Sequence, residues 1–149
     1  MSTIKDIMTK NVVTLKADNT VLDAAKLMKE RSLGCIIVVD GDDPLGIVTE
    51  RDFVRRVMAE ALPVTTVLSD VMSKPIMVID ANASVREAAR IMRDNKIRRL
   101  PVVEEEKLVG IVVASDLVRH LSRKPFTEKL SELILDALSR YPPDYPDYV

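Results

Sequence analysis

Two short segments of the sequence end in an aspartate that could bind a ligand. They are Thr49-Glu50-Arg51-Asp52 and Val113-Ala114-Ser115-Asp116. The two oxygens of a carboxylate can accept hydrogen bonds from the adjacent hydroxyls of a ribose. However, Thr49 and Asp52 also have the spacing of a capping box, so a structural role explains Asp52 equally well. In the second segment Val113 replaces the capping hydroxyl while the aspartate remains, which favours ligand contact at Asp116.

Two adjacent arginines, Arg98 and Arg99, are the other candidates for chemistry. Two guanidinium groups beside the expected start of a helix would form a local binding site for a phosphate. At the matching positions of the first half of the chain the sequence has Gly34 and Cys35. The alternative is a solvent-exposed basic pair whose charge is balanced by the nearby acidic run 104–106.

The side chains that enzymes and metal sites most often use are scarce. Cys35 is the only cysteine and His120 the only histidine. No disulfide can therefore form within the chain, and neither a Cys/His metal motif nor a nucleophile–base pair is recognisable. We expect Cys35 to be a small core residue and His120 to end a helix. The sequence predicts a protein that is not an enzyme and requires neither a metal nor another cofactor.

A tandem repeat must position these candidate residues. Residues 4–57 align on residues 68–121 at a constant offset of 64, without a gap. Each copy predicts a short strand, a capped helix, a hairpin of two apolar strands and a second helix. The first helix of each copy has apolar residues at the spacing of one buried stripe, at Val21, Ala24, Ala25 and Met28, and at Val85, Ala88, Ala89 and Met92.

The repeat predicts a mixed α/β (α+β) fold with the order β-α-β-β-α, twice. A unit of about 55 residues buries little apolar surface alone, and two copies packed about a pseudo-two-fold axis solve this problem. We assign residues 1–60 to the first repeat, 61–122 to the second and 123–149 to a C-terminal extension, with 58–67 as the connection.

The C-terminal extension carries two patterns. Residues 127–140 have the spacing of an amphipathic helix, and the Pro-rich residues 141–149 contain all three tyrosines. This tail is either unstructured or docks on a neighbouring subunit or a partner, and the sequence leaves both interpretations open.

The motif residues resemble a known family. Gly46–Asp52 and Gly110–Asp116 are similar to the signature of CBS domains, which is glycine, a hydrophobic residue, any residue, Thr or Ser, two further residues and Asp. Residues 95–103 resemble the start of the family's second strand, and the similarity spans about residues 4–121. Val113 departs from the signature. The resemblance implies a Bateman module, in which two CBS repeats form a cleft for AMP, ADP, ATP or S-adenosylmethionine.

The resemblance also implies which residues bind the ligand. In the family the signature aspartate receives the ribose hydroxyls, and nearby polar and basic residues take the phosphates. The start of the other repeat's first strand covers the adenine. One site would combine Thr49, Arg51, Asp52, Ile76 and Met77, and the other would combine Arg98, Arg99, Ser115, Asp116, Val12 and Val13. We expect two unequal sites, with the Asp116 site stronger for phosphorylated ligands.

The composition limits the remaining function classes. Hydrophobic residues make up 47% of the chain, and the net charge is −1, so overall charge attracts neither nucleic acid nor an anionic membrane. No segment has the pattern of a signal peptide or a membrane span, which predicts a cytoplasmic protein. We expect a homodimeric sensor of adenine nucleotides, and hence of energy state, that signals to an unknown protein partner through a conformational shift. The alternative is a dimerisation scaffold with no retained ligand site.

Overall fold

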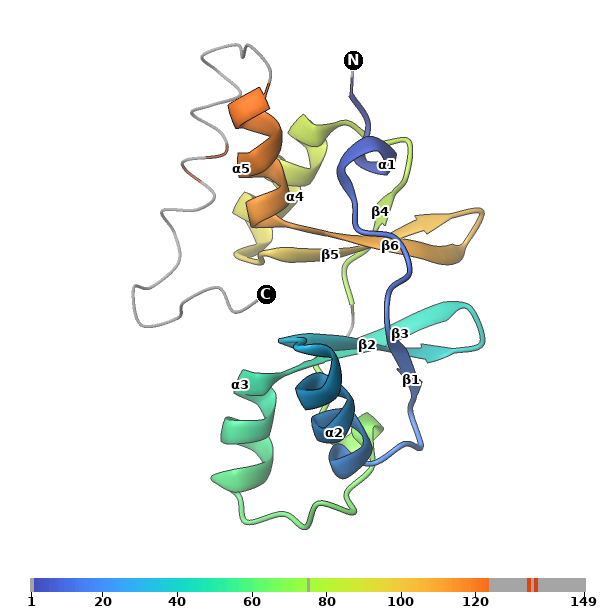
Figure 1. Ribbon diagram of the computed structural model, residues 1–149, viewed down its shortest axis with the longest axis vertical. Coiled ribbons are helices and arrows are strands. Elements are labelled where there is room, and N and C mark those ends of the chain that lie inside the picture. The colour runs from blue at the N-terminus through green and yellow to red at the C-terminus, as the bar shows by residue number, and fades with distance from the viewer. Residues whose placement is uncertain (1, 75, 124–133, 135, 137–149) are drawn as a thin grey trace. The chain divides into compact units, whose positions relative to one another are not determined.

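The computed structural model describes residues 2–74, 76–123, 134 and 136 (Figure 1). These residues form two compact units. Residues 13–74 and 76 form the first, which we call the Asp52 unit. Residues 2–12 and the described residues from 77 onward form the second, the Asp116 unit. The compact units therefore do not follow chain order, because residues 2–12 belong with the second repeat.

The Asp52 unit contains a three-stranded sheet in the order β1-β2-β3. β1 pairs with β2 in parallel, and β2 pairs with β3 in antiparallel fashion. Two helices, α2 and α3, lie on one side of this sheet (Figure 1). The elements are β1 (Thr14–Lys16), α2 (Val21–Arg31), β2 (Cys35–Asp40), β3 (Asp43–Thr49), α3 (Glu50–Asp52), the π-helical η1 (Phe53–Met58) and the 3-10 helix η2 (Leu68–Asp70).

The Asp116 unit has the same arrangement, with strand order β4-β5-β6 and the same pairing directions. Its hairpin has a register shift between Val102 and Val103, where the first hairpin has one between Val38 and Val39. The predicted mixed α/β class is therefore confirmed. Short helices precede the first strand of each repeat, which the sequence did not predict. The elements are α1 (Ile4–Ile7), β4 (Ile79–Asp80), α4 (Val85–Asn95), β5 (Arg99–Glu104), β6 (Lys107–Val113) and α5 (Ala114–Arg123).

The first helix of each repeat begins at the predicted cap. The N–H of Asp23 donates to the Thr20 hydroxyl at 3.1 Å, and the N–H of Thr20 donates to the Asp23 carboxylate at 2.9 Å. In the second copy the N–H of Glu87 donates to the Ser84 hydroxyl at 3.1 Å. These bonds satisfy backbone donors that a helix start leaves without an intrahelical partner.

Each unit has its own apolar core. In α4 the predicted stripe is buried at all four positions, but in α2 Ala25 is exposed, so that part of the prediction was wrong. The core of the Asp116 unit also includes a described residue from beyond the repeat. Ile134 is 1% exposed and joins the core that contains Ala89. The Asp136 Oδ2 lies 3.8 Å from the Arg93 Nε. The rest of the predicted C-terminal helix and tail lies outside the described residues.

The segment before each first strand packs on the other repeat. The N–H groups of Ile4 and Lys5 donate to the carbonyls of Ala83 and Ala81, both at 2.9 Å. At the matching positions the N–H of Leu68 donates to Asn19 and that of Ser69 to Ala17, at 2.8 and 3.1 Å. Ile4 is fully buried in the core of the Asp116 unit. The two repeats thus exchange their leading segments, and the chain passes between units after Val12 and after Ile76.

Residues 58–67, expected to connect the repeats, lie within the Asp52 unit. The N–H of Leu22 donates to the carbonyl of Val64 at 3.0 Å, and that of Val21 to Thr66 at 2.8 Å. Among the described residues, no helix has the length and apolar character needed to cross a membrane.

Candidate functional site

The glycine of each signature lets a second segment cross the strand that leads to the aspartate. In the Asp52 unit the N–H of Ser73 donates to the carbonyl of Ile47 at 2.9 Å, and the N–H of Ile47 donates back at 3.2 Å. A β-carbon on Gly46 would lie 2.7 Å from the Met72 sulfur and 2.9 Å from the Ser73 carbonyl oxygen. Glycine is required here because the backbones approach closely.

The Asp116 unit contains an equivalent crossing. Thr9 and Ile111 exchange backbone hydrogen bonds of 2.9 and 3.0 Å. A β-carbon on Gly110 would lie 2.6 Å from the Met8 sulfur and 2.8 Å from the Thr9 carbonyl oxygen. The signature glycine therefore serves the same packing role in both repeats.

Asp52 is buried, 7% exposed, at the start of the helix that follows β3. Its Oδ2 accepts from the backbone N–H of Thr49 at 2.9 Å and from the Thr49 hydroxyl at 3.1 Å. The Thr49 hydroxyl in turn accepts from the N–H of Asp52 at 3.2 Å. This is the predicted capping box, so one carboxylate oxygen is committed to the helix start.

The other oxygen of Asp52 faces two residues that the sequence did not single out. The Ser73 hydroxyl donates to Oδ1 at 3.3 Å, and the Arg56 Nε lies 3.6 Å from the same oxygen. The Arg56 Nη1 also donates to the carbonyls of Val71 and Met72, at 3.2 and 3.1 Å. Asp52, Arg56 and Ser73 therefore join the helix start to residues 71–73.

Asp116 is also buried, 5% exposed, but different groups hold it. The N–H of Val113 donates to its Oδ2 at 2.8 Å, and Arg119 forms an ion pair with its Oδ1. Half of the capping box thus survives without the hydroxyl, because a backbone N–H can donate to the aspartate whatever side chain the residue carries. This bond explains why an aspartate remains after Val113, so the loss of the hydroxyl does not favour ligand contact as the sequence suggested.

The arginine pair lies beside the start of α5. The N–H of Ala114 donates to the carbonyl of Arg98 at 2.8 Å, and Arg99 pairs with Val113 in the sheet register. Both arginine side chains are partly buried. Gly34 and Cys35 occupy the equivalent backbone positions in the Asp52 unit, where the N–H of Glu50 donates to Gly34 at 3.2 Å.

The structure divides the remaining predicted residues between the units. The Asp52 unit contains exposed Arg51 and partly buried Val13 and Ile76. The Asp116 unit contains partly buried Val12 and Ser115 and exposed Met77. The residues predicted to cover the adenine thus stand where the chain passes from one unit to the other.

Sequence reasoning missed Arg56, Ser73 and Arg119. In the repeat alignment Arg55 stands at the position of Arg119. Instead Arg56, four residues after Asp52, pairs with it in the π-helical segment. A π-helix has i→i+5 hydrogen bonds and a wider turn, which accounts for the longer spacing. The hydroxyl common to Thr9 and Ser73 is the signal that could have indicated Ser73.

The cysteine and the histidine of the chain do not lie in a recognisable reactive or metal-binding group of the described residues. Cys35 carries a partly buried thiol at the start of β2, and His120 is partly buried near the end of α5. Within residues 2–74, 76–123, 134 and 136, no group of three or more His, Cys, Asp or Glu side chains could hold a metal ion.

A family model matches most of the chain. The model of the CBS domain matches residues 4–59 and 68–123. The CBS domain-containing protein YhcV of Bacillus subtilis (strain 168) is 39% identical over 134 residues, which cover 89% of this chain and 96% of YhcV.

Solved structures with CBS domains share the fold. A putative signal-transduction protein from Burkholderia ambifaria MC40-6 has a TM-score of 0.75 and 32% identity, covering 85% of this chain and 99% of its own. CBSX2 in complex with AMP has a TM-score of 0.70 and 27% identity, covering 83% and 98%. A hexameric CBS-CP12 protein from bloom-forming cyanobacteria has a TM-score of 0.73 and 36% identity, covering 89% and 79%.

Proposed function

This chain belongs to the CBS domain family, and we propose that it is a regulatory protein that binds adenosine-containing ligands at Asp52 and Asp116. Pairs of CBS domains typically serve as regulatory modules for adenosine ligands, and such proteins are generally non-enzymatic. The observation that carries the proposal is the pair of buried carboxylates, 7% and 5% exposed, at the starts of two equivalent helices.

The two oxygens of each aspartate have separate roles in this proposal. Oδ2 accepts a backbone N–H from Thr49 or Val113 and fixes the carboxylate at the helix start. Among the described residues, the partners of Oδ1 are side chains, Ser73 and Arg56 for Asp52 and Arg119 for Asp116. Side chains can rotate away, so the ribose hydroxyls are proposed to take the Oδ1 position.

The phosphates and the adenine require further residues. We assign the phosphates to Arg98 and Arg99, supported by their backbone position beside the start of α5, with Ser115 next to Asp116. Thr49 and Arg51 have the matching role at Asp52. The apolar residues Val12, Val13, Ile76 and Met77 are proposed to cover the adenine.

The proposal favours AMP, ATP or S-adenosylmethionine as the ligand, with unequal sites. CBSX2, a structural relative, was solved with AMP. Because Gly34 and Cys35 replace the arginine pair, the Asp52 site is expected to depend less on phosphate than the Asp116 site. Self-association is part of the proposal, as a homodimer, and the hexameric CBS-CP12 protein is an oligomeric relative. A protein partner would read a ligand-dependent change.

One observation favours a second candidate function, a scaffold that binds no ligand. Val113 and Arg119 already occupy both oxygens of Asp116, so this aspartate has a structural explanation. In that case mutation of Asp116 would alter only stability and assembly, and addition of a nucleotide would alter neither.

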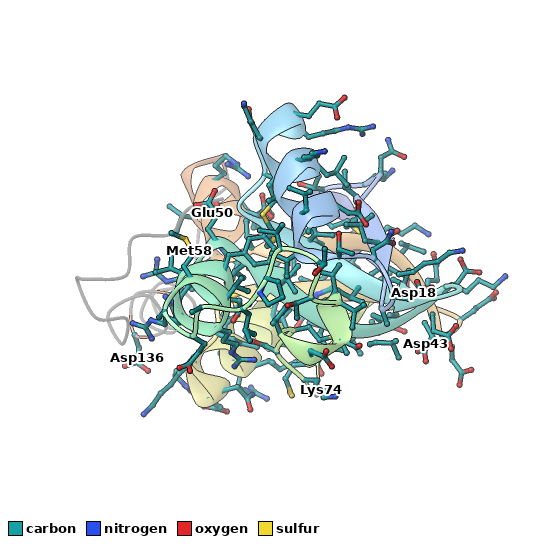
Figure 2. All side chains as sticks on the ribbon, turned by 90° about the horizontal axis from the view of Figure 1, so that it is seen from below. Asp18, Asp43, Glu50, Met58, Lys74 and Asp136 are labelled. Carbon is teal, nitrogen blue, oxygen red and sulfur yellow. The ribbon has the colours of Figure 1, made fainter. Side chains whose placement is uncertain are left out.

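Calorimetric titration with AMP, ATP and S-adenosylmethionine tests the proposal. We expect binding by the wild type and a loss of about 100-fold in affinity at the substituted site in Asp52→Asn and in Asp116→Asn, because each variant weakens charge-assisted hydrogen bonds. Asp18→Asn, which removes an exposed carboxylate (Figure 2), is the control and should bind as the wild type does. No binding of any of the three ligands would leave the scaffold interpretation.

A further inference from the structure

We propose that Arg56 and Ser73 connect Asp52 to residues 71–73, so that a ligand bound at Asp52 loosens this segment. This inference rests on the proposed function, since it states how occupancy of that site is transmitted. It assigns Arg56 as a positioning residue that acts on the backbone rather than on the ligand.

The contacts of Arg56 support this role. Its Nε lies 3.6 Å from Asp52 Oδ1, and its Nη1 donates to two successive carbonyls, Val71 at 3.2 Å and Met72 at 3.1 Å. Ser73 follows directly and donates its hydroxyl to the same Oδ1 at 3.3 Å. Three consecutive residues of one segment are thus joined, directly or through one guanidinium, to a single carboxylate oxygen.

The π-helical η1 places Arg56 for these contacts. Its widened turn is visible in the bond from the N–H of Ala59 to the carbonyl of Val54, 2.9 Å, which spans five residues. Glu50 and Met58, at the two ends of the α3–η1 helix, are exposed (Figure 2). Irregular helical turns of this kind occur often at functional sites because they redirect side chains.

The Asp116 unit lacks this connection among its described residues. His120 stands at the position of Arg56 in the repeat, and the pairing arginine is Arg119, three residues after Asp116. Thr9 corresponds to Ser73, but in the described part of the chain its hydroxyl donates no hydrogen bond to Asp116. Within the described parts of the chain, this connection is found at Asp52.

The position of the segment makes the connection useful. Residues 71–73 cross β3 at Gly46 and lead to Ile76, after which the chain enters the Asp116 unit. A ribose at Asp52 would compete with the Ser73 hydroxyl for Oδ1 and would draw the carboxylate from Arg56. Loss of these bonds would leave Ser73 held by its backbone pair with Ile47, while Val71 and Met72 keep their backbone bonds to Leu68 and their buried side chains.

Amide hydrogen exchange measured by NMR on the full chain tests the connection without a ligand. In Arg56→Ala we expect the amides of Ser73 and Ile47 to exchange about tenfold faster, because hydrogen bonds from a charged donor are lost. The equivalent amides of Thr9 and Ile111 should keep their rates. Arg119→Ala is the matched variant and should leave the Thr9 and Ile111 rates within about twofold.

Two results would overturn the proposal that Arg56 holds residues 71–73 in the absence of a ligand. One is an unchanged Ser73 rate in Arg56→Ala, and the other is an equal acceleration at Thr9 in Arg119→Ala. If Arg56→Ala does not fold, Arg56→Gln keeps the length and one amide donor while removing the charge, and it should accelerate Ser73 exchange by a smaller factor.

The ligand part uses adenosine as the probe, because it offers the ribose without phosphate. Saturating adenosine should accelerate Ser73 and Ile47 exchange at least threefold in the wild type and cause no further acceleration in Arg56→Ala. Adenosine that binds at Asp52, as shown by loss of binding in Asp52→Asn, yet leaves these rates unchanged or slower overturns the present inference alone. If neither adenosine nor any of AMP, ATP and S-adenosylmethionine binds, the proposed function fails, and ligand control of the segment fails with it.

Discussion

The Asp52 and Asp116 units have the same backbone design and different side chains around the carboxylate. Both have a parallel–antiparallel sheet, a register shift at the same place in the hairpin, and a glycine under a crossing segment. Asp52 contacts a threonine, a serine and an arginine, whereas Asp116 contacts a backbone N–H and an arginine. The fold tolerates this difference because the shared backbone bonds position each aspartate independently of the variable side chains.

The comparison shows which positions set the fold and which set the chemistry. Gly46 and Gly110 each pack closely against a methionine at the equivalent position of the other segment, so packing requires a glycine at both positions. Gly34-Cys35 and Arg98-Arg99 share a backbone position and differ completely in charge. Duplicated packing with divergent polar residues is what two sites of different ligand preference would require.

Substitution of either signature glycine should have the largest effect. Gly46→Ala and Gly110→Ala each force a β-carbon to within 3 Å of a sulfur and a backbone oxygen. We expect each variant to lose about 3 kcal/mol of unfolding free energy, because overpacking displaces the crossing segment. Urea denaturation measures this loss. If one variant is as stable as the wild type, the two crossings are not equivalent.

Removal of the arginine pair should separate the two sites by ligand. In Arg98→Ala/Arg99→Ala we expect AMP affinity to fall about 30-fold at the Asp116 site, since charge-assisted bonds to phosphate are lost. Adenosine affinity should change by less than about twofold, because adenosine lacks that phosphate. Calorimetry on both ligands checks this.

The control for that experiment is Arg86→Ala/Arg90→Ala. It makes the same change in net charge on the exposed side of α4. Equal losses of AMP affinity in both double variants would mean that overall charge, rather than the strand-start pair, attracts the phosphate.

Exchange of the capping residue between repeats should change the free energy of unfolding by about 1 kcal/mol. Thr49→Val removes the hydroxyl that accepts from the N–H of Asp52 at 3.2 Å, so the melting temperature should fall. Val113→Thr supplies the missing hydroxyl and should raise it. A rise of the melting temperature in the first variant or a fall in the second would show that apolar packing outweighs the cap at these strand ends.

The smallest expected effect concerns acid sensitivity at the α2 cap. The backbone N–H of Thr20 lowers the pKa of Asp23 below its ordinary value of 3.8, and the Asn19 amide and the Thr20 hydroxyl add to this. A carboxyl whose pKa is lowered on folding stabilises the protein above its unfolded pKa and loses that contribution as the pH falls through the folded value.

Asp23→Asn should therefore reduce stability slightly at neutral pH and flatten its decline below pH 3.8. Urea denaturation as a function of pH measures the slope, with Asp18→Asn as the control for an exposed carboxylate outside the cap. An unchanged slope in Asp23→Asn would show that this cap does not contribute to acid sensitivity.

The sequence predicted most of the fold because repeated local signals determine it. The capping residue Thr20, the β-branched run of β2 and the glycine at 46 each act over a few neighbours, and the second copy repeats the pattern. Ala25 was wrongly predicted to be buried and Arg56 was missed, because the surroundings of both depend on packing from distant segments. Arg56 in particular depends on a π-helical turn, which no residue pattern indicates.

The candidate site was predicted in part for the same reason. The arginine pair and the two aspartates lie next to helix starts, as the spacing predicted. Ser73 comes from a segment that crosses the strand, and only the exchange of leading segments between repeats brings it to Asp52. Contacts of this kind need tertiary structure to be seen.

The exchange of leading segments has a consequence for synthesis of the chain on the ribosome. The described residues of the Asp52 unit run from 13 to 76, so this unit can close while later residues are still being made. Ile4 is needed in a core with Leu100 and Leu117, which are translated far later. Residues 2–12 are therefore translated before the sheet on which they pack, and their apolar side chains stay exposed until that second sheet has formed.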